Sequence, residues 1–269
     1  MKPDVSVIII NYNTFQYTCN CIRSIIDKTI GVSYEIIVVD NASPKDDPDK
    51  FKELFPEIIL VKSTENIGFA KGNNLGIQYA NAEVYLLLNS DTSMVNDAIS
   101  IAYEKLMSKK EIGVVGAHFT FEDGRLQHSV QRFPEIKYQL IQLFRIQKLF
   151  SPRKRAQIML GGYFYCDFET YADWIWGTFF MIKKEVVEKM PNKKLADQFF
   201  MYSEDIQWGL DVKRGNYKTL FTPEAKIIHY GSINPNYVDD MIHDNLGTVL
   251  IQYYGRIYYG VYKLLNKII

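Results

Sequence analysis

Polar side chains follow three apolar runs of this sequence, at the points where the runs end. The polar stretches are Asn11-Tyr12-Asn13, Asp40-Asn41 and Asn89-Ser90-Asp91. A tyrosine ring can stack on a nucleobase, and a carboxylate can accept a hydrogen bond from a base N–H or a ribose hydroxyl. Asn and Asp also favour ordinary turns and helix caps, which is the alternative explanation for these stretches.

A divalent cation is the second ligand that such residues could bind. Asp91 would lie just beyond a buried strand, where one carboxylate can suffice because Mg²⁺ or Mn²⁺ keeps water molecules and substrate phosphate oxygens as further ligands. His229 ends another apolar run and could complete the site. Each residue also has a structural explanation: Asp91 could cap a helix over 95–107, and a lone histidine is often packed or hydrogen-bonded.

Two common phosphate-binding motifs are missing after the first apolar run. A dinucleotide site would need G-x-G-x-x-G and a nucleoside triphosphatase G-x-x-x-x-G-K-[ST], whereas this chain has NYNTFQ. Nucleotidyltransferases would likewise be expected to show a Gly-rich, basic loop here. The sequence therefore predicts a nucleotide site that is read by side chains such as Tyr12 and Asp40.

The elements that must position these residues alternate over the first hundred residues. Apolar, β-branched runs predict strands over 5–10, 35–39, 58–61 and 84–88. Helical spacing of apolar residues predicts helices after Thr14 and over 69–80. This order predicts an α/β fold with a mostly parallel sheet, in which a ligand binds at the carboxyl ends of the strands.

From about Gly113 the pattern becomes α+β. Ser203 is predicted to cap a helix that ends at Gly215. One long final helix with an apolar stripe is predicted over 246–268. The predicted strands of this half are 114–121, 126–130, 217–221 and 226–230.

Composition narrows the class of protein. Over 269 residues, Lys+Arg 31 balances Asp+Glu 31, so no overall field attracts nucleic acid. Three cysteines, with Cys19-x-Cys21 wrongly spaced for structural zinc, favour a reducing compartment. No export signal or membrane-spanning run is apparent. We therefore expect a cytoplasmic protein that binds no nucleic acid.

Seven motifs in this chain together resemble family 2 glycosyltransferases of the GT-A fold, and in particular their bacterial rhamnosyltransferase-like subgroup. In chain order they are VSVIIINYN (5–13), EIIVVDNAS (35–43), ENIGFAKGNNLGI (65–77), LLLNSDT (86–92), DWIWGTFFMIKKE (173–185), FFMYSEDIQWGLDVKRG (199–215) and IIHYGS (227–232). The resemblance implies one GT-A domain over 1–235, with a nucleotide-sugar-binding half (1–112) and an α+β acceptor and catalytic half (113–235). A C-terminal amphipathic helical tail (236–269) would follow.

The resemblance also implies a donor site. The expected nucleotide-binding residues are Asn11, Tyr12, Asp40, Asn66, Gly68, Phe69, Asn73 and Asn89. The family usually carries a D-x-D metal motif, whereas this chain has Asn89-Ser90-Asp91 and lacks the first carboxylate. Asp91 and His229 are then the expected ligands of Mn²⁺ or Mg²⁺, and Asn89 is expected to hydrogen-bond the ribose.

The Glu204-Asp205 pair resembles the family's E-D motif, in which the second carboxylate is the general base. The resemblance implies that Asp205 is catalytic, with Glu204 beside it. The chemistry agrees, because inverting transfer needs one carboxylate on the face of the sugar opposite the leaving nucleotide. Without the surrounding motifs, two acids in a first helical turn could simply complement the helix dipole.

Acceptor binding is expected at Asp173, Trp174 and Trp176, where relatives bind this substrate. An indole face stacks on a sugar ring while a carboxylate binds hydroxyls. The alternation of Trp174, Trp176 and Thr178 could equally be one face of a core strand.

Two basic segments could contact an anionic surface. Arg153-Lys154-Arg155 could bind acceptor phosphates or a headgroup, although a short charged run is usually a solvated loop. The final helix is rich in tyrosine and basic residues, with no acid after Asp244. This composition suits peripheral contact with the inner face of a membrane, or packing against its own domain or a partner subunit.

The sequence thus predicts an inverting, metal-dependent glycosyltransferase of bacterial surface polysaccharide synthesis. Its partners would be a nucleotide-sugar donor, with dTDP-L-rhamnose as the best candidate, and a saccharide or lipid-linked acceptor. One alternative is a UDP-sugar-dependent transferase of the same family. The other is a non-catalytic saccharide-binding or scaffold protein, because the first metal carboxylate is replaced by Asn89.

Overall fold

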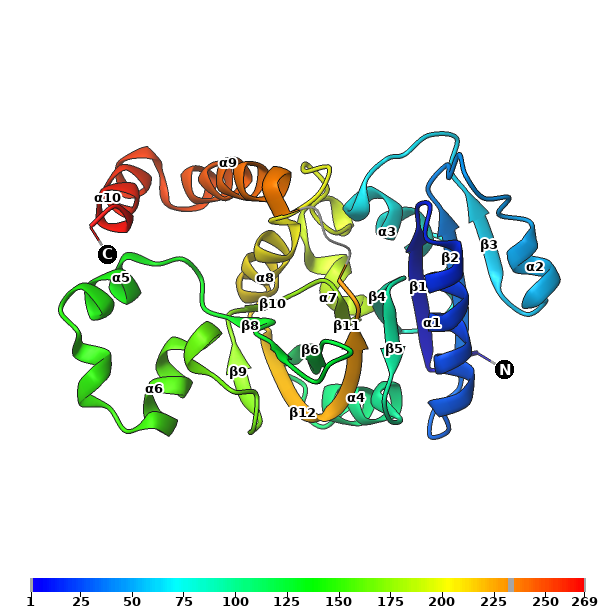
Figure 1. Ribbon diagram of the computed structural model, residues 1–269, viewed down its shortest axis with the longest axis horizontal. Coiled ribbons are helices and arrows are strands. Elements are labelled where there is room, and N and C mark those ends of the chain that lie inside the picture. The colour runs from blue at the N-terminus through cyan, green and yellow to red at the C-terminus, as the bar shows by residue number, and fades with distance from the viewer. Residues whose placement is uncertain (1, 232–234, 269) are drawn as a thin grey trace.

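The computed structural model describes residues 2–231 and 235–268 (Figure 1). Its centre is a mixed sheet in the order β3-β2-β1-β4-β11-β6-β12-β5. The first half alternates strands and helices as predicted: β1 (Val5–Asn11), α1 (Phe15–Lys28), β2 (Tyr34–Asp40), α2 (Lys50–Leu54), β3 (Ile59–Lys62), α3 (Phe69–Ile77) and β4 (Val84–Asn89). Strands β1, β2, β3 and β4 are mutually parallel, so their carboxyl ends meet at one edge.

The second half adds antiparallel strands and most of the helices. Its elements are β5 (Thr92–Met94), α4 (Ala98–Met107), β6 (Ile112–Thr120), β7 (Leu126–Gln127), β8 (Val130–Gln131), α5 (Ile136–Leu143), η1 (Ile146–Leu149), α6 (Pro152–Met159), η2 (Gly161–Tyr163), β9 (Thr170–Ala172), β10 (Trp174–Ile175), β11 (Phe179–Lys183), α7 (Lys184–Lys189), η3 (Pro191–Lys193), α8 (Glu204–Arg214), β12 (Lys218–His229), α9 (Pro235–Tyr254) and α10 (Arg256–Asn266).

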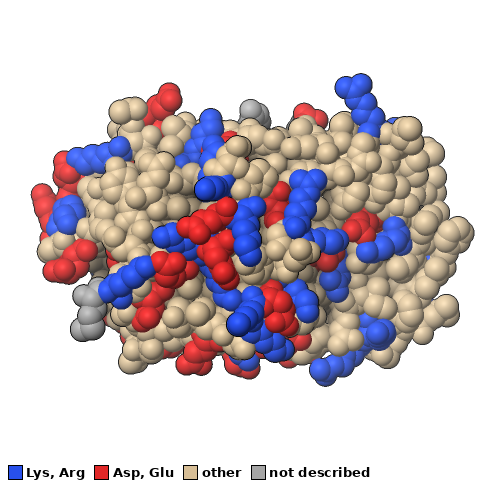
Figure 2. Space-filling model, turned by 180° about the vertical axis from the view of Figure 1, so that it is seen from behind, with Lys and Arg blue, Asp and Glu red and all other residues tan. Residues whose placement is uncertain are grey.

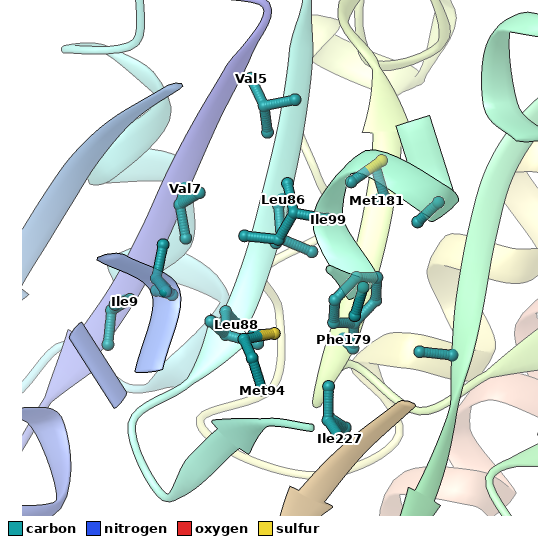
Figure 3. Packing of buried hydrophobic residues seen from close by; sticks show 14 of the residues in the cluster. Val5, Val7, Ile9, Leu86, Leu88, Met94, Ile99, Phe179, Met181 and Ile227 are labelled. Carbon is teal, nitrogen blue, oxygen red and sulfur yellow. The ribbon is translucent and has the colours of Figure 1, made fainter. Parts of the chain in front are cut away.

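The strands are apolar on both faces because helices cover both sides of the sheet. Val7 and Ile9 of β1 point into one core cluster, while Ile8 between them belongs to a second cluster. Figure 3 shows the first cluster, in which Leu88 of β4 and Phe179 of β11 also take part. Burial on both faces explains why the sequence shows continuous apolar runs there rather than alternation.

Four predictions about elements were wrong in detail. The single helix predicted over 246–268 is two helices, because Gly255 adopts a left-handed conformation (φ 89°) between α9 and α10. The separate strands at 217–221 and 226–230 are one strand, β12, with an irregularity after Phe221. The predicted strand at 126–130 is interrupted and forms β7 and β8. Arg153-Lys154-Arg155 lies in α6, whose first turn is capped by the Ser151 hydroxyl, rather than in a loop.

Two predicted helix caps are also corrected. Ser203 precedes α8, but its side chain makes no capping hydrogen bond and its backbone is left-handed (φ 68°). Asp91 caps no helix, because α4 begins seven residues later and is capped by Asp97, whose carboxylate accepts from Ser100 N. The helix-cap explanation for Asp91 is therefore wrong.

Across residues 2–231 and 235–268, no helix combines the length and the apolar character that crossing a bilayer requires. The division of the chain at residues 112 and 235 stays a prediction.

Candidate active site

The carboxyl edge of β1 and β2 is held together by buried side chains. Asn11 pairs with Asp40 across the two strands, and its Nδ2 donates to Asp40 Oδ1 at 2.7 Å. The backbone N–H of Ser43 donates to Asp40 Oδ2 at 3.1 Å. Asn11 is fully buried and Asp40 is 3% exposed, whereas the neighbouring Tyr12 is 43% exposed. Asn11 therefore positions Asp40, while the Tyr12 ring is accessible to a ligand.

Asn41 fixes the predicted nucleotide turn and was missed as a site residue. Its Nδ2 donates to Asn66 Oδ1 at 2.8 Å and to Gly68 O at 3.2 Å, and its Oδ1 accepts from Ile67 N at 3.1 Å. Asn66 Oδ1 also accepts from Gly68 N. The signal was present in the sequence, because Asn41 directly follows Asp40 at the end of a strand.

At Gly68 the two halves of the chain approach each other closely. Its φ is 83°, and a Cβ atom at this position would lie 2.4 Å from the carbonyl oxygen of Phe200. The backbone N–H of Phe69 donates to that same oxygen at 3.0 Å. Asn74 of α3 adds two hydrogen bonds to Leu195, one to its carbonyl and one from its N–H. The segment before α8 is thus held against α3, next to the nucleotide turn.

Asn73 is fully buried under the first turn of α3, so in this structure it contacts protein. Its Nδ2 donates to Phe69 O at 3.0 Å, and its Oδ1 has no hydrogen-bond partner among the described residues. Phe69 itself stacks on Trp208 of α8, with ring centroids 6.1 Å apart. Asn73 and Phe69 therefore support the candidate nucleotide site through contacts with the protein.

A chain of backbone contacts connects the end of β4 to the start of α8. Asn89 N donates to Thr178 O at 3.0 Å, and Asn89 Nδ2 lies 3.4 Å from Thr178 Oγ1. The next residue back, Gly177, donates its backbone N–H to the Asp205 carboxylate. Asp205 is consequently placed at the same sheet edge as Asn89, although the two are far apart in sequence.

The start of α8 is electrostatically unusual. Glu204 is 6% exposed and Asp205 is half-buried. Burial raises the pKa of both carboxyls well above their ordinary range, and the nearby Asp205 charge raises the pKa of Glu204 further. The N–H groups of Ile206 and Gly177 donate to Asp205 and favour its ionised form. Asp205 is therefore the more readily ionised carboxyl of the pair, and a general base must be ionised to accept a proton.

This segment also carries strain and unpaired polar atoms. Tyr202 and Ser203 both have φ 68°, a left-handed conformation that side-chain-bearing residues rarely adopt. Within the described part of the chain, Ser203 Oγ, Glu204 Oε2 and Gln207 Oε1 are buried without a hydrogen-bond partner. Strain and unsatisfied polar groups of this kind cluster at functional sites.

The structure brings Asp91 and His229 together. The β5 strand that follows Asp91 pairs with the end of β12, where His229 faces Thr92. His229 Nε2 lies 3.5 Å from Asp91 Oδ1, and both side chains are 12% exposed. A third residue that sequence reasoning missed, Gln127, binds His229 twice: its Oε1 lies 2.7 Å from His229 Nδ1 and its Nε2 donates to His229 O at 2.7 Å.

The Gln127 contacts determine which ring nitrogen of His229 carries the proton in the neutral form. Because Gln127 Nε2 donates to the backbone, its Oε1 is the atom at Nδ1, and a carbonyl oxygen can only accept. Nδ1 therefore carries the proton, and in the neutral ring Nε2 presents a lone pair toward Asp91. An imidazole nitrogen and a carboxylate that face each other can both bind a divalent cation. Gln127 would then orient the histidine without binding the metal itself.

The two protein ligands fit a cation that is also held by a substrate. The described residues contain no group of three or more His, Cys, Asp or Glu that could hold a metal ion. Mg²⁺ and Mn²⁺ sites that bind phosphates commonly use one or two protein ligands and complete their shell with phosphate oxygens and water. Asp91 and His229 match this arrangement.

The predicted acceptor residues divide into two groups. Asp173 accepts from Phe133 N at 3.0 Å and pairs with Arg132 at 3.3 Å. Asp173 and Arg132 both line a cavity of about 260 Å³. Trp174 is partly buried, and its indole N–H donates to Arg132 O at 3.0 Å. Trp176 packs against the first core cluster. Only Asp173 of the three lines this cavity.

A second cavity of about 260 Å³ lies on the other side of α8. It is lined by Gln207, Asp211 and Arg214 of α8, by Tyr253 of α9 and by the loop before α8, including Lys194. Tyr253 donates its hydroxyl to Asp211 Oδ1 at 2.9 Å, so α9 is anchored to α8. Helix α8 thus lies between two cavities and carries Asp205 at its start.

The chain belongs to glycosyl transferase family 2. The family described as "Glycosyl transferase family 2" matches residues 6–190, which is more than half of the sequence. The minor teichoic acid biosynthesis protein GgaA of Bacillus subtilis is 25% identical over 169 residues, which cover 60% of this chain and 36% of GgaA. The chain spans 25% and 42% of the length of the first two curated relatives that it matches.

Solved structures confirm the predicted fold. GalNAc-T7, crystallised with UDP, GalNAc and Mn²⁺, matches 97% of this chain and 50% of its own, with a TM-score of 0.65 and 14% identity. The mannosyltransferase PcManGT of Pyrobaculum calidifontis, in complex with GDP-Man and Mn²⁺, matches 98% of this chain and 74% of its own, with a TM-score of 0.56 and 16% identity. The chain therefore has a GT-A-like α/β fold.

Proposed function

We propose that this protein is an inverting glycosyltransferase that moves a sugar from a nucleotide-diphosphate donor to a saccharide acceptor during surface glycan synthesis. The observation that carries the proposal is the chain of contacts from Asn89 through Thr178 and Gly177 to Asp205, which puts a high-pKa carboxylate beside the donor edge. Family membership and the similarity to a teichoic acid biosynthesis protein support the substrate class.

The donor would bind at the carboxyl edge of β1, β2 and β4. Tyr12 offers an exposed ring for stacking, and Asp40, held by Asn11, offers a fixed carboxylate to the base or ribose. The rhamnosyltransferase-like motifs make dTDP-L-rhamnose our first candidate donor. UDP sugars are the second candidate, since GalNAc-T7, a neighbour in fold, binds UDP.

Asp91 and His229 would hold Mn²⁺ or Mg²⁺ at the donor diphosphate. A bound cation of this kind neutralises charge that develops on a diphosphate leaving group. Gln127 keeps the Nε2 lone pair of His229 directed at the site, and Asn89 remains available through its carboxamide to the donor's ribose.

Asp205 would act as the general base. The acceptor hydroxyl oxygen forms the new bond to the anomeric carbon while the bond from that carbon to the diphosphate oxygen breaks, and the hydroxyl proton goes to the Asp205 carboxylate. The nucleotide diphosphate leaves from the opposite face, so the anomeric configuration inverts. A base whose pKa is raised toward the working pH is the most effective, and such bases typically contribute about 10²- to 10⁴-fold in rate.

Nucleotide-dependent thermal stabilisation tests the donor site first. We expect one of dTDP, UDP and GDP to raise the melting temperature in the presence of Mn²⁺, because a ligand at about 100 times its Kd stabilises by about 2.7 kcal/mol. The shift should require Asp91 and be lost in Asp91→Ala. The matching sugar nucleotide should then be turned over, with release of the nucleotide diphosphate, when acceptor is supplied.

Two outcomes would contradict the proposal in different ways. If no nucleotide stabilises the protein with or without Mn²⁺, the donor site is wrong. If a nucleotide binds but its sugar is never transferred to any saccharide or lipid-linked acceptor, the non-catalytic alternative holds, as the missing first carboxylate at Asn89 would suggest.

A further inference from the structure

Two segments far apart in the sequence are rich in basic residues and contain no acid. Residues 136–166 hold six Lys or Arg and residues 245–268 hold three, and neither segment contains Asp or Glu, although the charges of the whole chain balance. The basic residues are Lys137, Arg145, Lys148, Arg153, Lys154, Arg155, Arg256, Lys263 and Lys267. All the acids of the chain lie elsewhere, so this asymmetry concentrates positive charge wherever the two segments meet.

The two segments pack together at one end of the molecule. The Tyr258 hydroxyl of α10 accepts from Ile136 N at 3.0 Å, and Tyr262 O accepts from Gln139 Nε2 of α5 at 3.0 Å. In Figure 1, α5, α6 and α10 form the end that lies opposite α2 and β3. At the outermost right of Figure 2, which is the same end seen from behind, the visible charged side chains are blue. We call this region, formed by α5, η1, α6 and α10, the basic lobe.

The outer face of α10 is apolar and uncovered. Ile257, Val261, Leu264 and Ile268 follow one another at helical spacing and are 88%, 43%, 61% and 59% exposed. Tyr258 and Tyr262, one position further round the helix, pack toward α5. None of the side chains of α10 is buried. A continuous stripe of this kind differs from the scattered apolar side chains that ordinary surfaces carry.

Basic residues flank this stripe on α10 itself. Arg256, Lys263 and Lys267 each precede a stripe residue by one position, so they line one side of it, and all three are exposed. The neighbouring η1 segment adds Leu149, 83% exposed, beside the basic Lys148, and α5 is followed by Phe144, 69% exposed, beside Arg145. Long basic side chains can extend to a polar interface while the adjacent apolar groups enter a less polar layer.

We propose that the basic lobe docks on the surface of an anionic lipid bilayer, with the outer face of α10 lying in the interface. An apolar stripe flanked by Lys and Arg, with tyrosines at its border and no acid, is the composition of helices that lie in the membrane plane. Charge complementarity selects the occupant: nine basic residues, of which Lys137 pairs with Glu135 just outside the segment, match a negative headgroup layer rather than a second copy of this electrically balanced chain.

Docking would have a consequence for the acceptor, which rests on the proposed function. Helix α9 joins α10 to α8 through the bond from Tyr253 to Asp211, so the bilayer would lie at the acceptor end of the chain rather than at the donor edge. An acceptor anchored to a lipid would then be presented to Asp205 from the docked surface.

Vesicle flotation with the full chain tests the docking. We expect binding to vesicles of phosphatidylcholine and phosphatidylglycerol in equal parts and little binding to phosphatidylcholine alone. The triple variant Arg256→Gln, Lys263→Gln, Lys267→Gln should partition on the order of 100-fold more weakly. The pair Ile257→Ser, Leu264→Ser should weaken partition about tenfold or more. All five side chains are exposed, so the variants should keep the wild-type melting temperature.

Matched variants at the opposite end serve as controls. Lys28→Gln, Lys45→Gln, Lys50→Gln removes three exposed basic residues outside the lobe, and Ile30→Ser, Leu54→Ser removes two exposed apolar ones. Both should bind anionic vesicles as the wild type does. Docking is refuted if the wild type fails to float with anionic vesicles, if both sets of variants lose binding equally, or if the apolar pair instead abolishes a dimer seen without lipid. Nucleotide stabilisation of the same variants reports on the proposed function separately.

Discussion

The donor edge and the start of α8 lie side by side but satisfy their polar groups very differently. At the donor edge, Asn11, Asp40 and Asn41 are buried and each has its side chain bonded to a defined partner. At the start of α8, Ser203 Oγ and Glu204 Oε2 are buried without a partner in the described residues, and the backbone before them is strained. Buried polar side chains thus have defined hydrogen-bond partners in one region, and some of them have none in the other.

This difference matches the two proposed roles: the donor edge would recognise the nucleotide, and the start of α8 would take part in the chemical step. A fully paired network is rigid, which suits a site that must present fixed groups to a nucleotide. Burial raises the pKa of both carboxyls at the start of α8, although Asp205 still accepts from Ile206 N, and a base with a raised pKa can take a proton near neutral pH. The start of α8 would then sacrifice stability for activity, as functional sites often do.

The largest effect should come from the base. Asp205→Asn keeps the shape of the side chain but removes the group that takes the proton, so we expect the transfer rate to fall by about 10²- to 10⁴-fold. Nucleotide binding, measured by calorimetry, should stay within twofold of wild type. Glu188→Gln, an exposed acid on α7, is the control and should transfer normally. Wild-type transfer by Asp205→Asn would remove this residue from the mechanism.

The second effect concerns Gln127, which we place as a positioning residue for His229. Gln127→Ala frees Nδ1 and should weaken Mn²⁺ affinity about 10- to 100-fold, measured by titrating Mn²⁺ against nucleotide-dependent stabilisation. Gln127→Glu keeps an acceptor at Nδ1 and should recover most of the affinity. Gln16→Ala, exposed on α1, should change nothing. Equal affinity in all variants would show that Gln127 does not orient His229 for a metal ion.

The third effect tests how much the paired donor edge stabilises the fold. Asn41→Ala removes three hydrogen bonds around the nucleotide turn and leaves buried groups unpaired, so the free energy of unfolding should fall by about 1–3 kcal/mol. Nucleotide affinity should fall with it. Asn20→Ala, on the exposed face of α1, provides the matched control in urea unfolding. An unchanged stability would mean that the turn is held by its backbone alone.

The smallest effect has the opposite sign. Burial raises the pKa of Glu204, so the folded state holds this proton more tightly than the unfolded chain and its stability falls as pH rises above the ordinary value of 4.5. Glu204→Gln should therefore be more stable than wild type at pH 8, by roughly 2–4 °C for each kcal/mol gained, and equal to it at pH 4. A lower melting temperature for Glu204→Gln than for the wild type at pH 8 would show that the ionised Glu204 stabilises the fold, contrary to this prediction.

Local patterns predicted most of the fold. The runs at 5–10 and 84–88 are apolar on both faces, so they indicated buried parallel strands and hence the edge where Asn11, Asp40 and Asn89 meet. The prediction of one helix over 246–268 failed because the apolar stripe continues across Gly255. The spacing of apolar residues does not show that Gly255 has a positive φ. The helix at 152–159 was missed although Ser151-Pro152 is a typical helix start.

Single motifs predicted individual candidate residues of the site. They did not predict the contacts that residues far apart in the sequence make with them. The Asp91 and His229 pair followed from the resemblance, but the Gln127 contact joins residues 102 positions apart and has no local pattern. The same is true of Asn74, which binds Leu195 at a separation of 121 residues. The raised pKa of Glu204 also depends on burial by other elements, so the sequence motif gave the residue without its electrostatics.

The long separation between Gln127 and His229 has a consequence for the growing chain on the ribosome. Strands β1 to β4 pair with one another within the first ninety residues, whereas β4 gains its second neighbour, β11, only later in the chain. The cation site and the clamp on Gly68 cannot form until Phe200 and His229 have left the exit tunnel. A nascent chain would thus expose its donor edge early and become able to hold a metal-bound nucleotide only after residue 229 has emerged.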